Sequence, residues 1–155
     1  MKQEFKVCEV KLSYKPNFKL SERPEVSSSQ MAYEIFRSHW DEETMQFLES
    51  FKVLLLNKGN RVLGLLDLSL GGLDHTTADM RVIFAAALKA GATGLILAHN
   101  HPSGTKKPST ADISITERIN KAAKILSINV LDHLIVTHDE GYYSFQDEGM
   151  MLEGG

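Results

Sequence analysis

The stretch Leu95-Ile96-Leu97-Ala98-His99-Asn100-His101-Pro102-Ser103-Gly104 places a short apolar run directly before two histidines. A run of this length bounded by turn residues is typical of a buried strand, and the Pro and Gly that follow predict a loop. Residues two apart in an extended chain face the same side at a spacing of about 6.6 Å. The sequence therefore predicts a buried strand that brings His99 and His101 to one site.

The elements around this strand alternate between helical and extended patterns, with turn residues between them. Gly91 is placed to end one helix, and Ser29 to cap another. Gly71-Gly72 is expected to end a hairpin. The expected helices cover residues 30–39, 80–90 and 115–126, and a further short segment covers 41–49. The expected strands cover residues 8–14, 51–56, 62–70, 95–98, 130–137 and 142–145, the second and third of them paired as the antiparallel hairpin.

The composition is that of an ordinary globular domain, with 43% apolar and 24% charged residues in 155. Cys8 is the single cysteine, which excludes an internal disulfide, and its alternating surroundings predict a small buried strand residue. No apolar run reaches the roughly 20 residues that span a bilayer, and no signal-peptide core is visible. We expect a cytoplasmic protein that does not enter a membrane.

The net charge is −3, and no dense basic patch is present. Charge alone therefore gives no case for nucleic-acid binding. Lys and Arg outnumber the acidic residues in residues 1–24, whereas the only charged residues from Asp139 onward are acidic.

Asp112 completes a candidate metal site. The loop after His101 returns the chain, so that Asp112 can supply an oxygen ligand beside the two imidazoles. Two histidines and one carboxylate, with a fourth position left for water, are typical of catalytic zinc. Ser109 and Asp112 also have a structural explanation, because S-x-x-D at a helix start is a capping-box pattern. The two roles can coexist, and spacing alone does not choose between them.

The segment from His99 to Asp112 fits H-x-H-x7-S-x2-D at every specified position, and so resembles the JAMM (MPN+) metalloproteases. Most of the chain, from about Ser27 to Gly149, is similar to the RadC family of bacterial proteins. The similar segments include HNHPSG at 99–104, Glu49-Ser50-Phe51, and Asp132-His133-Leu134-Ile135. The resemblance implies one α/β JAMM-like domain over 27–155, with a mixed sheet flanked by helices as in cytidine deaminases. Residues 1–26 would be an N-terminal strand and linker extension.

The resemblance also implies roles for single residues. His99, His101 and Asp112 match the zinc ligands, and Ser109 matches the serine that stabilises the oxyanion. Glu49 is the candidate for the catalytic glutamate, which transfers a proton from water to the leaving amine.

The remaining histidines are less informative. His75 and His133 each follow an aspartate. Either could support a metal ligand, but packing or a surface hydrogen bond is the simpler expectation.

These observations support three hypotheses. The first is a zinc-dependent hydrolase that cuts a peptide or isopeptide bond. The second is an accessory factor in DNA repair or recombination, as associated with the RadC family. Full-length relatives carry a helix-hairpin-helix segment for DNA, and residues 1–24 are too short to form one. The third is an inactive JAMM scaffold, against which the full set of site residues argues.

Overall fold

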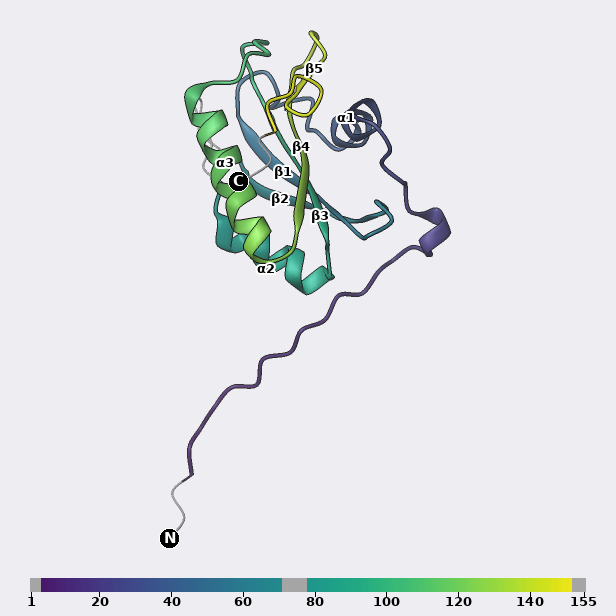
Figure 1. Ribbon diagram of the computed structural model, residues 1–155, viewed down its shortest axis with the longest axis vertical. Coiled ribbons are helices and arrows are strands. Elements are labelled where there is room, and N and C mark those ends of the chain that lie inside the picture. Colours follow the sequence, from purple (N-terminus) through teal and green to yellow (C-terminus); the bar gives the residue numbers. More distant parts are fainter. Residues whose placement is uncertain (1–3, 71–77, 152–155) are drawn as a thin grey trace.

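The computed structural model describes residues 4–70 and 78–151. Its centre is a five-stranded mixed sheet with the strand order β2-β1-β3-β4-β5 (Figure 1). Only β3 and β4 run parallel, and the other neighbouring strands are antiparallel. The strands are β1 (Ser50–Leu56), β2 (Val62–Leu70), β3 (Gly94–Asn100), β4 (Asn129–Val136) and β5 (Tyr142–Ser144). The helices are η1 (Leu20–Glu22), α1 (Ser29–Ser38), α2 (Met80–Ala90) and α3 (Thr110–Ile125).

Helices cover both faces of this sheet, with α1 on one face and α2 and α3 on the other (Figure 1). Side chains alternate across each strand, so β3 sends Leu95 and Leu97 toward α2 and α3, and Ile96 and Ala98 toward α1. The result is two separate apolar cores, which confirms the expected α/β domain with a mixed sheet flanked by helices. The next odd-numbered residue, His99, consequently belongs to the face of α2 and α3.

Local capping explains where the helices begin and end. The side chain of Asp79 accepts a hydrogen bond from the backbone of Arg81 at the start of α2, and Gly91 ends that helix with a φ of 72°. A left-handed residue in this position favours glycine, as the sequence predicted. At α1 the cap is Ser28, which accepts from the backbone of Met31. The expected cap, Ser29, is instead the first residue of the helix.

The expected strand over residues 8–14 is wrong. No strand is assigned there, Cys8 is exposed, and Val10 and Leu12 are 85% and 81% exposed. Most of the segment extends away from the sheet (Figure 1), and no strand among the described residues pairs with it. Alternating apolar and polar residues are therefore not sufficient to form a strand, because a strand also requires a neighbouring strand to pair with. The side chain of Tyr14 contacts the sheet, donating to the carbonyl of Leu63.

Two further expectations need comment. In the expected segment 41–49, residues 42–47 form turns, and the amides of Thr44 and Met45 donate to the carbonyl of Asp41. The predictions for Gly71-Gly72 and His75 fall outside the described residues. Among the described residues, the model contains no helix that is long and apolar enough to cross a membrane.

Candidate metal centre

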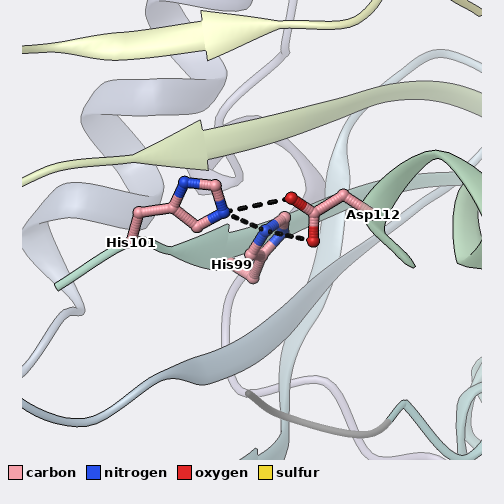
Figure 2. Close-up of side chains that lie close together, drawn as sticks. All are labelled: His99, His101 and Asp112. Atoms are coloured by element: carbon pink, nitrogen blue, oxygen red, sulfur yellow. Dashed lines mark hydrogen bonds and ion pairs between the residues drawn. The ribbon is translucent and has the colours of Figure 1, made fainter. Parts of the chain in front are cut away.

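The site lies where β3 ends, beside the first turn of α3. His99 is the penultimate residue of β3, and His101 follows the strand directly. Both side chains lie on the sheet face that α3 covers, and Asp112 projects toward them from the first turn of α3 (Figure 2). The carboxyl ends of neighbouring parallel strands are a common place for functional side chains, because the following loops and helix starts converge there.

Three side chains meet at equal distances, with both carboxylate oxygens of Asp112 taking part. Nε2 of His99 lies 3.1 Å from Nε2 of His101 and 3.1 Å from Oδ1 of Asp112. Nε2 of His101 lies 3.1 Å from Oδ2 of Asp112. An ion bound tetrahedrally at about 2.0–2.1 Å from each ligand would hold such atoms about 3.3 Å apart. The spacing of the three side chains therefore fits a single metal ion, and the cluster could hold one.

The hydrogen bonds at Nδ1 of His99 and His101 indicate whether Nε2 of each ring carries a proton or a lone pair. Nδ1 of His101 lies 2.6 Å from the carbonyl of Thr105, which can only accept, so Nδ1 is the protonated nitrogen. Nδ1 of His99 lies 2.8 Å from Nε2 of His133. When both Nδ1 atoms donate, the two Nε2 lone pairs face one another across 3.1 Å. A cation between them would relieve that repulsion, and neutral imidazole is the form that binds metals.

The charges of the cluster support one another. Burial raises the pKa of Asp112, but the side chains of His101 and His99, which lie within hydrogen-bonding distance of its carboxylate, outweigh burial and hold that pKa far below its usual range. Burial lowers the pKa of His101, but the hydrogen bonds to Asp112 and to the carbonyl of Thr105 raise it above its ordinary value overall. The negative charges of Asp112 and Glu49 add to this increase. A carboxylate that stays ionised is what a cation at this site requires.

Ser109 caps α3, as the S-x-x-D pattern predicted. Its Oγ accepts from the amide of Asp112 at 3.0 Å, and its own amide donates to Oδ2 of Asp112 at 2.8 Å. The capping box and the candidate metal cluster therefore share the same carboxylate, so the two roles are compatible. Because the capping bond uses a lone pair of the hydroxyl oxygen, its proton remains able to donate elsewhere.

Glu49 lies close enough to His101 to act on its charge. Phe51 of β1 pairs with His99 of β3 in an antiparallel register, and extending that register by two residues brings Glu49 opposite His101. The effect of Glu49 on the pKa of His101 agrees with this proximity. Glu49 is partly buried and lies outside the three-residue metal cluster.

Asn100 fixes the backbone next to Glu49. Its Oδ1 accepts from the amide of Ser50 at 2.7 Å, and its Nδ2 donates to the carbonyls of Met45 and Leu48 at 2.8 and 2.9 Å. The side chain of Asn100 is completely buried. The turns before β1 are thereby tied to the end of β3, which positions Glu49. No role was expected for Asn100 from the sequence, although its place between the candidate ligands His99 and His101 could have indicated a role in the site.

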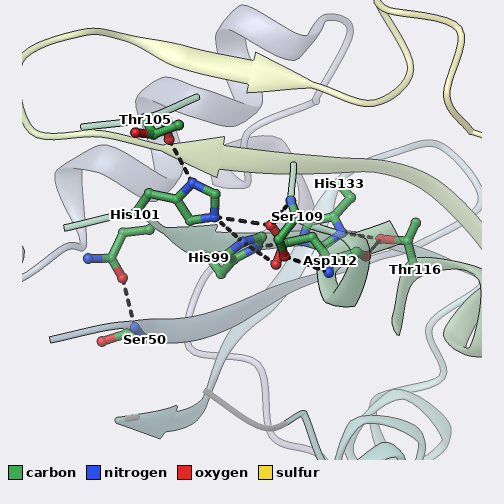
Figure 3. Close-up of polar contacts among 9 residues, drawn as sticks. Ser50, His99, His101, Thr105, Ser109, Asp112, Thr116 and His133 are labelled. Carbon is green, nitrogen blue, oxygen red and sulfur yellow. Dashed lines mark hydrogen bonds and ion pairs between the residues drawn. The ribbon is translucent and has the colours of Figure 1, made fainter. Parts of the chain in front are cut away.

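His133 is also part of the site, contrary to the simpler expectation of packing or a surface contact. It is completely buried, its ring stacks on Phe145, and its Nε2 contacts His99 (Figure 3). Its Nδ1 lies 2.6 Å from Oγ1 of Thr116, which donates to the carbonyl of Asp112 at 2.7 Å. Complete burial favours the neutral ring of His133 and holds its pKa well below the ordinary value. Sequence spacing could not reveal this contact, because it depends on the parallel pairing of β3 with β4.

Comparison with known proteins assigns this chain to a family. Residues 26–150 match the model of the RadC-like JAB domain. A UPF0758 protein of Porphyromonas gingivalis is 40% identical over 136 residues, which are 88% of this chain and 59% of the relative. A UPF0758 protein of Flavobacterium johnsoniae is 52% identical over 102 residues, which are 66% of this chain and 44% of the relative. The chain thus spans about half the length of these curated relatives. It belongs to the RadC-like JAB domain family, within the JAMM superfamily.

Proposed function

We propose that this protein is a zinc-dependent hydrolase of the JAMM type that cuts a peptide or isopeptide bond. The observation that carries the proposal is the convergence of two imidazole Nε2 atoms and one carboxylate at 3.1 Å from each other. His99, His101 and Asp112 would hold the metal. Two nitrogen ligands and one oxygen ligand suit catalytic zinc, which keeps a position open for water or substrate.

The metal, when bound, supplies a Lewis acid that activates water and polarises the carbonyl of the substrate. Glu49 would take the proton of the attacking water and pass it to the leaving nitrogen. Ser109 would donate its hydroxyl proton to the oxygen on which negative charge develops. Ser109 is the N-cap of α3, and its two hydrogen bonds with Asp112 hold it beside the candidate ligands.

An amide is the substrate class that uses all of these groups. Amide cleavage needs a proton delivered to a poorly leaving nitrogen, and Glu49 provides a carboxylate for that step. The oxyanion that develops at the carbonyl needs a neutral donor, which Ser109 provides. Membership in the JAMM superfamily agrees with this choice. We propose that the substrate that contains this amide is either a linear peptide or an isopeptide-linked protein.

The test measures hydrolysis by zinc-loaded protein on two sets of quenched fluorescent substrates, one of linear peptides and one of lysine isopeptides. Wild-type protein is expected to cut members of one set. Glu49→Gln should keep bound zinc but lose at least about 100-fold in kcat, because only the proton carrier is lost.

Asp112→Ala is the second variant of this test and should lose both zinc and activity. A wild type that binds zinc but cuts neither set would contradict the proposal and favour the scaffold hypothesis. Equal activity in Glu49→Gln and wild type would exclude the assigned role of Glu49.

A further inference from the structure

The hydrogen bonds behind His99 form a continuous chain that returns to another candidate ligand. It runs from Nδ1 of His99 to His133, from His133 to Thr116, and from Thr116 to the backbone carbonyl of Asp112. His99 and His133 come from the parallel strands β3 and β4, whereas Thr116 and Asp112 come from α3. Figure 3 shows these four residues together, and the last contact is made by the backbone carbonyl of Asp112. Two ligand-bearing elements are thereby linked without any contribution from a metal.

The direction of every hydrogen bond in this chain follows from its last acceptor. A carbonyl can only accept, so the hydroxyl of Thr116 must donate its single proton to Asp112. Oγ1 of Thr116 then accepts, so Nδ1 of His133 carries a proton. In a neutral ring Nε2 of His133 is consequently the acceptor, and Nδ1 of His99 must donate to it. The lone pair of His99 is then on Nε2, which is the atom that faces His101 and Asp112.

From this geometry we propose that Thr116 and His133 are positioning residues, which fix His99 in the tautomer that binds the metal through Nε2. The inference rests on the proposed metal site and deepens it. A ligand whose tautomer is already fixed does not have to redistribute its proton when the metal arrives. Orienting partners of metal-bound histidines typically change metal affinity by about 10- to 100-fold.

The chain offers a matched control for Thr116. Thr137 is also buried, donates its hydroxyl proton to a backbone carbonyl at 2.7 Å, and accepts one N–H, from Glu140, at 2.9 Å. It has the same hydrogen-bonding role as Thr116, but its partners do not lead to a candidate ligand. Thr116→Val and Thr137→Val therefore remove equivalent groups, and only the first interrupts the chain to His99. Thr116→Ser restores the hydroxyl.

The experiment combines nitrogen-15 spectra of the histidine rings in metal-free protein with zinc affinity measured by chelator competition. Wild type, Thr116→Ser and Thr137→Val should show His99 protonated at Nδ1 and should bind zinc alike. Thr116→Val should lose the single tautomer and bind zinc about 10- to 100-fold more weakly.

Two results would overturn the inference. One is His99 protonated at Nε2 in the metal-free wild type. This result is obtained on wild-type protein and does not depend on whether any variant folds. The other is a Thr116→Val protein that keeps both the wild-type spectrum and the wild-type affinity. If the spectra behave as expected but the wild type binds no zinc, the fixed tautomer stands and the proposed function fails.

Discussion

The two faces of β3 carry neighbouring polar residues that do different things. Asn100 lies on the side of α1, and its three hydrogen bonds all go to backbone groups of the turns before β1. His99 lies on the opposite side, and only one of its ring nitrogens is bound to a group that orients it. Its other nitrogen faces His101 and Asp112. A buried polar residue that serves structure is satisfied by the chain, whereas His99 directs a lone pair at a place suited to a cation.

The largest effect on stability is expected from Asn100→Ala. The change leaves the amide of Ser50 and two carbonyls without partners at a buried position, which should lower the free energy of unfolding by about 3 kcal/mol. Zinc affinity should change by less than about tenfold, because the three candidate ligands remain. Denaturant unfolding and chelator competition on the same protein would measure both quantities. A folded Asn100→Ala protein without zinc affinity would show that the two faces are not independent.

A smaller effect is expected from removing helix caps on the two faces. Ser109 caps α3 at the site, and Ser28 caps α1 on the opposite side of the sheet. Either serine replaced by alanine should lower the free energy of unfolding by about 1 kcal/mol. Only Ser109→Ala should also reduce kcat, by at least about tenfold, since it removes the proposed oxyanion donor. Equal kcat in Ser109→Ala and Ser28→Ala would show that Ser109 serves only as a helix cap.

The weakest effect concerns pH and the metal-free protein. The folded pKa of His101 is raised, so its stabilising contribution is complete below its unfolded pKa near 6.5 and is lost as pH rises through the folded value. The folded pKa of Asp112 is lowered, so its contribution is present above about pH 4 and is lost only in stronger acid. Metal-free wild type should therefore exceed His101→Gln in stability by more at pH 5.5 than at pH 8.5, with a difference below about 1 kcal/mol. A difference that grows with pH would contradict this sign.

The sequence predicted most of the sheet and the centre of the site, because these depend on local patterns. The apolar run before His99, the stripe that ends at Gly91 and the S-x-x-D pattern at Ser109 each specify their structure within a few residues. The contact of His133 with His99 depends instead on which strands pair and in which register. The prediction for Cys8 was wrong for a different reason. The alternating residues around it indicated a buried strand, but no described strand pairs with this segment and Cys8 is exposed.

The central claim is that His99, His101 and Asp112 hold a metal ion. Elemental analysis of protein purified without chelators tests it directly, with His99→Ala and Asp112→Ala prepared in parallel. We predict close to one zinc per wild-type chain and almost none in either variant. A folded wild type that neither retains nor takes up zinc would contradict the claim, and stoichiometric iron in its place would replace the proposed hydrolase with a different metal chemistry.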